Sequence, residues 1–312
     1  MRRRTISAIA VAATAFASYG AASASTPARI AGRGAAPVEV AGASGTAGGT
    51  RRPTRILSLS ASATQMLYAI GAGGQVVGVD KYSTYPPNAP RTSFTGYESS
   101  AEDYLPLRPD LVILAFDTSH LVAQLHSLHI ATLVLPPATT VAGADTQIRE
   151  LGRATGHAAA AGTVVVSIHD DLAKVVRSVG TRAAGRTYYI ELDPTYYSAT
   201  SKTFIGSLFS RFGMVDVADA AGRASSGYPQ LSAEYLVKSN PDYVFLADTV
   251  CCAQSARTFA ARPGFAGLRA VHLDHVIPVN DSTASEWGPH SLETFAALIA
   301  RAVERRGASG TK

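Results

Sequence analysis

A sixteen-residue pattern occurs twice in this chain, and it constrains the fold more than any other feature. The first copy, SAEDYLPLRPDLVILA, spans 100–115 and the second, SAEYLVKSNPDYVFLA, spans 232–247; eight of the sixteen positions are identical without a gap. In each copy a helical segment ends at a proline, Pro109 or Pro241, and an aspartate then starts an apolar strand. A chain that repeats a helix–strand unit in this way is expected to contain two similar α/β lobes.

Apolar runs separated by helical segments extend this prediction to the rest of the chain. Beyond the strands of the two copies, such runs predict strands at 55–60, 75–80, 131–136, 186–192 and 275–279. Strands that are apolar throughout are typical of parallel sheets covered by helices on both faces. With 312 residues, of which 46% are hydrophobic and 16% charged, the chain is long enough to give each of two lobes a core.

One long helix is expected between the lobes. The segment 157–180 has no proline and a single glycine before its last residue, and a helix of about 23 residues there is about 35 Å long. The predicted fold class is therefore α/β, with two Rossmann-like lobes, 55–156 and 181–312, that carry parallel sheets and are joined by a single long interlobe helix. A ligand cleft between the lobes is expected.

Three further helices follow from end signals. They are predicted at 62–71, where Ser62 and Gln65 have the spacing of a capping box and Gly71 marks the end, at 201–213, which ends at Gly213, and at 291–305.

The amino-terminal part of the chain has the pattern of a secretory signal. Residues 1–24 contain three arginines, a short apolar run and a small-residue cleavage motif, and 25–54 is rich in Ala, Gly and Ser, as in a flexible linker. Removal of the signal lowers the net charge from +5 to +2, and no basic stripe with aromatic residues remains, so a nucleic-acid partner is not expected. The protein is predicted to be exported, secreted or associated with the cell surface; no cysteine for lipid attachment follows the signal.

Polar and aromatic residues cluster just after the predicted strands. Ligands of parallel α/β sheets bind beyond the carboxyl ends of the strands, and flat aromatic faces with hydroxyl groups suit a broad macrocycle. Any single aromatic side chain here is expected to serve packing more often than ligand contact; it is the clustering that indicates a site. The predicted ligand-binding residues are Ser60, Ala61, Ser62, Tyr82, Tyr85, Tyr97, Phe116 and Asp117 in the first lobe and Tyr196, Tyr197, Glu286 and Trp287 in the second.

The stretch RILSLSASATQMLYAIGAGGQVVGVDKYSTYPPNAP resembles the first lobe of class III extracytoplasmic solute-binding proteins, which have a rigid interlobe helix and serve ABC importers. The resemblance covers about 55–303 and is greatest to the cobalamin-binding branch, in SLSASAT and YSTYPP. It implies a protein that carries a chelate, with cobalamin as the favoured ligand, to a permease dimer and that requires no cofactor; a monomer is expected. Because the chain has one tryptophan where cobalamin binders often have several, a ferric siderophore or haem stays open as the ligand.

The resemblance also implies a role for one glutamate in each copy of the repeat. In the family, each lobe presents a surface glutamate that engages arginines of the permease, and Glu102 and Glu234 stand at the matching positions. The alternative is that each acid only interacts with the helix dipole at a helix start. The occurrence of both in the same register favours the docking role.

Few other residues suggest chemistry. Cys251 and Cys252 are the only cysteines, and such a pair forms either a vicinal disulfide that stiffens a binding loop or a buried thiol pair. The histidine pairs of HSLH and HLDH lack further ligands nearby, so no metal site is expected. No nucleophile elbow, phosphate loop or zinc-protease helix is found, so an enzyme is not expected; a secreted hydrolase or metal-dependent enzyme is the weaker alternative.

Overall fold

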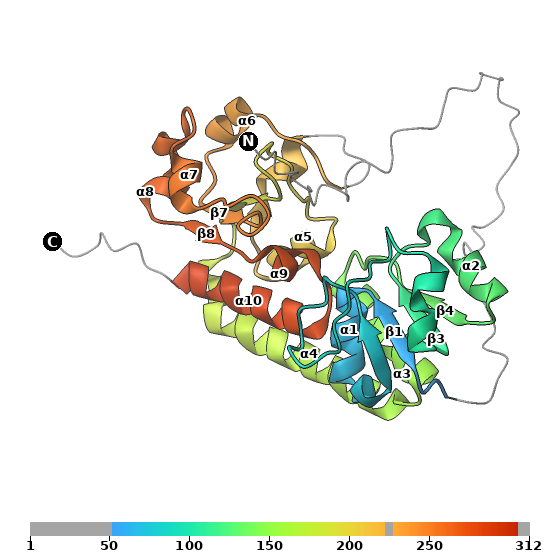
Figure 1. Cartoon of the computed structure of the whole chain (residues 1–312). Helices are drawn as coiled ribbons and strands as arrows, with labels where there is room; N and C mark the ends of the chain where they lie inside the picture. Colours follow the sequence, from blue (N-terminus) through green and yellow to red (C-terminus); the bar gives the residue numbers. More distant parts are fainter. Residues whose placement is uncertain (1–51, 222–226, 305–312) are drawn as a thin grey trace, which may run out of the picture. The chain divides into compact units, whose positions relative to one another are not determined.

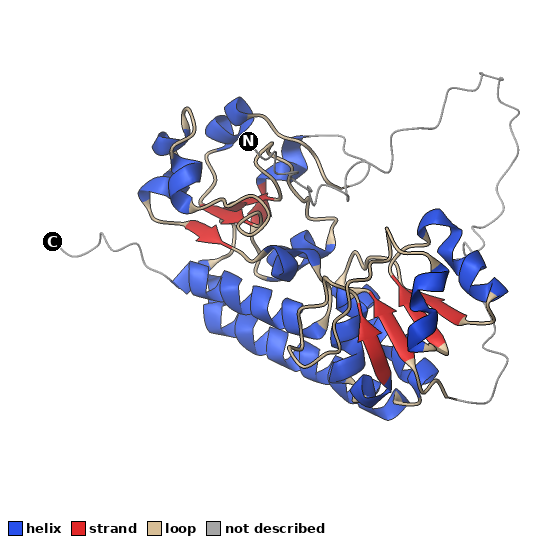
Figure 2. Ribbon diagram, viewed as in Figure 1, coloured by secondary structure: helices blue, strands red, loops and turns tan. Residues whose placement is uncertain are grey.

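The computed structural model describes residues 52–221 and 227–304, all of them within one compact unit of the chain. The predicted signal at 1–24 and all but the last three residues of the predicted linker at 25–54 lie outside the described residues. Within the described residues, no helix is long and apolar enough to cross a membrane. The described structure contains two separate parallel sheets, each accompanied by helices, as Figures 1 and 2 show.

The first sheet has the strand order β2-β1-β3-β4, with all neighbours parallel. One face packs against α1 and α3, and the other packs against η2 and α2. All four residues of β1 and of β3 are buried, and Ser58 is the one polar residue among these eight. The elements of this part are β1 (Ile56–Leu59), α1 (Ala61–Ala69), η1 (Ala72–Gln75), β2 (Val76–Val79), η2 (Ala101–Leu107), β3 (Leu111–Leu114), η3 (Thr118–His120), α2 (Leu121–Ser127), β4 (Ala131–Val134) and α3 (Val141–Thr155).

The second sheet has the equivalent order, β6-β5-β7-β8, and is also parallel. Its elements are η4 (Gly180–Arg182), β5 (Thr187–Glu191), α5 (Phe204–Arg211), β6 (Val215–Asp216), η5 (Val217–Ala221), α6 (Ala233–Ser239), β7 (Tyr243–Leu246), α7 (Ala256–Ala260), η6 (Phe265–Gly267), α8 (Arg269–His272), β8 (Val276–Pro278) and α9 (Asp281–Ser285). The two parallel sheets with their covering helices confirm the predicted α/β class and its two similar lobes.

The sequence repeat corresponds to equivalent structure in the two lobes. Each copy begins with a short helix, η2 or α6, and ends in the third strand of its sheet order, β3 or β7. Both helices end at a left-handed residue just before the proline, Arg108 at φ 46° and Asn240 at φ 44°. The first copy forms a 3-10 helix, and Pro106 lies inside it.

The aspartate of each copy fastens its strand to the neighbouring strand. The Asp110 carboxylate accepts hydrogen bonds from the backbone N–H groups of Thr54 and Arg55, at 2.8 and 2.9 Å, at the start of β1. In the same way the Asp242 carboxylate accepts a bond of 3.0 Å from the N–H of Thr187, the first residue of β5. The aspartate that both copies of the repeat share therefore aligns two strands at their amino ends in each lobe.

Two long helices lie side by side and connect the lobes. Helix α4 (Ala158–Val179) takes the place of the predicted interlobe helix, and α10 (Pro289–Glu304) packs along it (Figure 1). The last helix also contacts α1 of the first lobe. One continuous core contains side chains of both sheets together with α1, α3, α4, α5 and α10. The connection is therefore a pair of packed helices with a shared core, not an isolated helix.

The start of the first helix differs from its prediction. The capping residue is Ser60, whose extended backbone at φ −145° precedes α1 and whose hydroxyl accepts a bond from the N–H of Ala63. Ser62 and Gln65, predicted to form the cap, are buried inside the helix. The predicted helix at 201–213 is shorter in the structure, because Thr203 caps α5 at its start.

Candidate ligand-binding site

A buried network of hydroxyl groups and one carboxylate organises the strand ends of the first lobe. The Thr64 hydroxyl lies 2.9 Å from the hydroxyl groups of both Ser58 and Ser83. The Asp80 carboxylate, directly after β2, accepts a bond of 2.9 Å from the Ser83 N–H. Burial raises the pKa of Asp80 above its usual range. This network holds the backbone of the loop that carries Tyr82 and Tyr85.

Four predicted aromatic residues of the first lobe are exposed at these strand ends. Tyr82 and Tyr85 are each 40% exposed, Tyr97 is 46% exposed and Phe116 is 43% exposed. The rings of Tyr97 and Phe116 lie 6.2 Å apart and line a small hollow together with Leu59, Gly96 and Ala115. Water solvates clustered aromatic rings poorly. These four exposed rings therefore form a surface suited to a flat ligand.

Ser60, Ala61 and Asp117 have local structural contacts. Ser60 caps α1, Ala61 is the first residue of that helix, and the Asp117 carboxylate accepts a bond of 2.9 Å from the Val122 N–H in α2. These three residues shape the strand ends through the backbone.

Ser62, Glu286 and Trp287 are brought together at a junction between the lobes. The Trp287 backbone N–H donates to the Ser62 hydroxyl at 3.0 Å, and the indole N–H donates to the Gln147 side chain on α3 at 2.7 Å. The indole is partly buried against the shared core. Trp287 therefore packs between elements of the two lobes, and its N–H is used within the protein.

The side chain of Glu286 is bonded across the same junction. Its carboxylate accepts hydrogen bonds from the Gln65 amide and, at 3.0 Å, from the Ser291 hydroxyl, and Gln65 itself donates to Ser291 at 2.8 Å. Burial, chiefly, raises the pKa of Glu286 to about 7. A Cβ atom on Gly288 would lie 2.7 Å from Cβ of Gln65, so a glycine is needed for this close approach.

A ring stack adds a further contact at the junction. The rings of Tyr85, in the loop after β2, and His290, in the first turn of α10, are stacked at 3.6 Å with an interplanar angle of 5°. Tyr85 therefore belongs both to the exposed aromatic surface and to the contact between the lobes.

In the second lobe, Tyr196 lies over a buried ion pair. Glu191, at the end of β5, is fully buried and accepts two bonds of 2.6 Å from Arg262. The guanidinium lies 5.4 Å from the centre of the Tyr196 ring. Tyr197 is half-buried. In the part of the chain that the structure describes, neither tyrosine has a ring contact with the exposed aromatic residues of the first lobe.

Asp248, the second residue after β7, lies beside this ion pair. It is fully buried, and neither of its carboxylate oxygens has a hydrogen-bond partner among the described residues. Burial, and next the charge of Glu191, raise the pKa of Asp248 well above its usual range. The buried carboxyl of Asp248 thus lies beside Glu191 at the base of the loop that follows β7.

That loop contains a disulfide between Cys251 and Cys252. The carboxylate of Asp281, at the start of α9, accepts a bond of 2.9 Å from the Val250 N–H and one of 2.7 Å from the Cys251 N–H. The Thr249 hydroxyl donates to the carbonyl oxygen of Val279 at 2.7 Å. The loop is therefore held against the segment that leaves β8.

The two glutamates of the repeat are exposed in the first turn of η2 and α6. The N–H of Glu234 itself, and next the Ser232 hydroxyl, lower the pKa of the Glu234 carboxyl, which keeps it charged. Both glutamates thus present their carboxylates to solvent in the same structural context.

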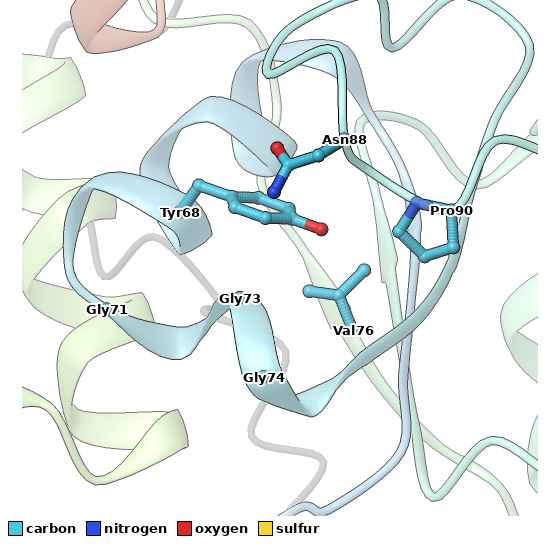
Figure 3. A pocket seen from close by; sticks show the side chains of 7 residues that line it. All are labelled: Tyr68, Gly71, Gly73, Gly74, Val76, Asn88 and Pro90. Carbon is cyan, nitrogen blue, oxygen red and sulfur yellow. The ribbon is translucent and has the colours of Figure 1, made fainter.

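A separate hollow of about 550 Å³ lies beside the amino end of β2. Figure 3 shows the side chains of Tyr68, Val76, Asn88 and Pro90 around it, with Gly71, Gly73 and Gly74 below. None of the predicted ligand-binding residues lines this hollow. Because it lies away from the carboxyl ends of the strands, we do not assign the ligand to it.

Several residues of the site and junction were not predicted from the sequence. Gln65, Gln147, Ser291 and His290 join the lobes, and Asp281 holds the disulfide loop. Their partners are mostly far away in the sequence, as with Gln65 and Glu286. Glu191 and Asp248 did carry a signal, because each is an acid at the end of an otherwise apolar strand segment.

Comparisons with known proteins agree with this architecture. A family model described as "Periplasmic binding protein" matches residues 56–283. A cobalamin-binding protein of Halobacterium salinarum is 31% identical over 256 residues, covering 79% of this chain and 68% of the relative. A substrate-binding lipoprotein of an ABC transporter of Bacillus subtilis, named as uncharacterized, is 28% identical over 253 residues, 78% of either chain.

Solved structures show the same fold. The periplasmic vitamin B12-binding protein of Vibrio cholerae has 22% identity and a TM-score of 0.64, covering 81% of this chain and 99% of that chain. A periplasmic haem-binding protein of Roseiflexus sp. RS-1 has 21% identity and a TM-score of 0.70, with 80% and 99% coverage. From the family match over most of its length and the two-lobe fold, this chain belongs to the periplasmic binding protein family.

Proposed function

We propose that this protein is the substrate-binding protein of an ABC importer and that it captures a large chelate, cobalamin or a related corrinoid. The observation that carries the ligand is the 31% identity to a cobalamin-binding protein over 79% of this chain. The relatives of Pectobacterium carotovorum and Vibrio cholerae that match at 26% identity are also named vitamin B12-binding proteins.

The exposed surface at the strand ends supports a broad, flat ligand. The exposed rings at Tyr82, Tyr85, Tyr97 and Phe116 offer apolar faces together with phenol groups, which suit a corrin ring with an amide rim. We infer that the chelate binds between the lobes against this surface. Ser62, Glu286 and Trp287 then act mainly by holding the two lobes together at the junction.

The connection between the lobes favours small movements on binding. The helices α4 and α10 pack along each other, and the junction adds the bonds of Trp287 and Glu286. A helix pair with a shared core resists bending more than two loop segments would. We therefore infer a limited hinge motion during capture and release.

Docking to the permease is proposed to use Glu102 and Glu234. They occupy equivalent positions in the two lobes and both are exposed. Two carboxylates related by an approximate twofold axis can meet two arginines on a permease dimer through charge-assisted bonds. The protein would act outside the cytoplasmic membrane, either released or held at the cell surface.

An iron chelate, a ferric siderophore or haem, is the second candidate ligand. The only tryptophan of the chain, Trp287, is used at the junction, whereas three exposed tyrosines stand at the strand ends. Tyrosine oxygen is a known ligand of ferric haem. This alternative keeps the fold and the docking role and changes only the cargo.

Titration calorimetry of the purified protein tests the function. It would be titrated with cyanocobalamin, a ferric hydroxamate siderophore and haemin, and the ligand recovered afterwards would be analysed. Nanomolar binding of cyanocobalamin, about −12 kcal/mol, with unchanged ligand supports the proposal. Binding of an iron chelate alone would replace the cargo, and chemical conversion of the ligand would instead indicate an enzyme.

A further inference from the structure

The disulfide loop of the second lobe is the counterpart of the Phe116 turn of the first. The repeat ends at Ala115 in one lobe and at Ala247 in the other, directly after β3 and β7, which hold equivalent places in the two sheets. In the first lobe the chain then presents Phe116, which is 43% exposed. In the second lobe it presents Val250, which is 69% exposed.

Val250 is the most exposed large apolar side chain in the described ranges 52–221 and 227–304. It stands next to Cys251, which is also exposed, and the half-buried Cys252 completes the disulfide. A disulfide carries no hydrogen-bond donor and is polarisable, so this tip is apolar in character. Exposed apolar side chains that stand next to one another at a strand end mark a surface for a ligand or partner.

The loop behind this tip has a fixed shape. Asp281 accepts bonds from two consecutive N–H groups, those of Val250 and Cys251, and the Gln254 N–H donates to the carbonyl oxygen of Asp248 at 3.3 Å. The Gln254 side chain in turn accepts a bond of 2.8 Å from Arg262, the cation of the buried ion pair. The apolar tip is therefore held by the half-buried Asp281 carboxylate and, through Gln254, is linked to Arg262.

We propose that the turn Val250–Cys252 is a ligand-contact platform that packs against the apolar face of the chelate, and that the Cys251–Cys252 bond sets its shape. This inference rests on the proposed function, since it assigns a contact to the same cargo. The two lobes would then offer apolar tips from equivalent strands, Phe116 from one and Val250 with the disulfide from the other.

Reduction of the disulfide is expected to weaken this contact. A tertiary phosphine in water would break the S–S bond and become the phosphine oxide, while the two sulfurs take up two electrons and two protons to give two thiols. The cross-link between adjacent residues is lost, and two weakly polar S–H groups replace an apolar surface. Affinity for the chelate would therefore depend on the redox state of Cys251 and Cys252.

Calorimetry with cyanocobalamin, haemin and the ferric hydroxamate siderophore on four proteins tests the platform. These are the wild type, Val250→Ser, the double variant Cys251→Ser/Cys252→Ser, and the control Val166→Ser, which changes an exposed valine on α4. We expect Val250→Ser to weaken binding of the accepted ligand three- to tenfold and the double variant tenfold or more, with the control within twofold. Thermal unfolding and circular dichroism of each protein verify that it is folded.

The outcomes separate the two proposals. A wild type that binds any of the three ligands while both loop variants bind it equally well overturns the platform and leaves the proposed function. A wild type that binds none of the three ligands overturns both. Normal binding by the loop variants with reduced uptake into cells would assign the tip to the permease, which also rejects the platform.

A chemical measurement avoids substitutions altogether. The protein is reduced with the phosphine, desalted under nitrogen, and alkylated with N-ethylmaleimide, in which the Cys251 thiolate adds to the carbon–carbon double bond. We expect the bound ligand to slow alkylation of Cys251 at least fivefold, as measured by mass spectrometry of the peptide. An unchanged alkylation rate in the presence of a ligand that binds the reduced protein contradicts the platform.

Discussion

The indole N–H of Trp287 donates a hydrogen bond to the side-chain oxygen of Gln147 across 2.7 Å. This bond joins the segment before α10 to α3, and the backbone N–H of the same tryptophan reaches Ser62 at the start of α1. One residue thus links the segment before α10 to two helices of the first lobe, α1 and α3. These contacts indicate that Trp287 stabilises the junction between the lobes.

Substitution of Trp287 is therefore expected to lower stability. Trp287→Ala removes a partly buried indole from the shared core and should lower the free energy of unfolding by about 3 kcal/mol. Trp287→Phe keeps most of the packing but leaves Gln147 Oε1 without its donor, which should cost about 1 kcal/mol. Urea denaturation measures both. Equal stability of wild type and Trp287→Ala would show that the indole contributes nothing to the junction.

Glu286 is expected to make stability depend on pH. Its pKa is raised to about 7 in the folded protein, from an ordinary value of 4.5. The folded state therefore binds more protons than the unfolded state between these values, and the free energy of unfolding falls as pH rises from about 4.5 to 7. Since one pKa unit is about 1.4 kcal/mol, this loss approaches about 3 kcal/mol above pH 7.

The variant Glu286→Gln isolates that contribution. Its amide keeps the size of the side chain and cannot ionise, so stability measured by urea denaturation from pH 4.5 to 8 should fall less than in the wild type. The difference between the two curves should grow across this range and stay constant above it. Parallel curves would mean that Glu286 does not titrate between the two values.

The ion pair of Arg262 and Glu191 is expected to be costly to break. Arg262→Met leaves the fully buried Glu191 carboxylate without its cation, which should destabilise the protein by about 3–5 kcal/mol. The control Arg257→Met changes an exposed arginine of α7 and should stay within about 0.5 kcal/mol of the wild type. Thermal and urea unfolding report both. A similar small effect of the two substitutions would argue against a charged pair.

Reversal of charge at Glu102 and Glu234, the proposed docking residues, should separate ligand binding from transport. Glu102→Arg/Glu234→Arg is expected to bind the chelate with unchanged affinity and to abolish uptake by cells that carry the permease. Glu304→Arg, at the end of α10, serves as a control with a reversed charge outside the repeat. Lost ligand binding in the double variant, or normal uptake, would contradict the assigned role.

Most strands could be predicted from the sequence, because inner strands such as β3 and β7 are apolar runs with every residue buried, whereas the two-residue β6 (Val215–Asp216) was not predicted. The predicted strand at 110–115, for example, corresponds to β3 at Leu111–Leu114. A disulfide between Cys251 and Cys252 could also be considered from the sequence, because adjacent residues are always close in space. The capping residue of α1 was predicted two residues late, because Ser60 and Ser62 are both plausible caps and only the backbone decides between them.

The junction could not be predicted in the same way. Glu286 and Trp287 were predicted to face a ligand because they follow a strand, yet their side chains bond to Gln65 and Gln147. A polar side chain on the buried side of a helix, such as Gln65, shows only that some partner exists. The identity of that partner depends on how two distant segments pack, which no local pattern encodes.

The clamps formed by Asp110 and Asp242 have a consequence for engineering. Each carboxylate fixes strand alignment at the amino end of its sheet, at Thr54 and Arg55 in one lobe and at Thr187 in the other. The residues that align the strands therefore lie at the opposite ends of the strands from the proposed ligand site. If the ligand binds there, a turn transplanted from a relative with different cargo onto the far end of β7 would leave the alignment of the sheet intact.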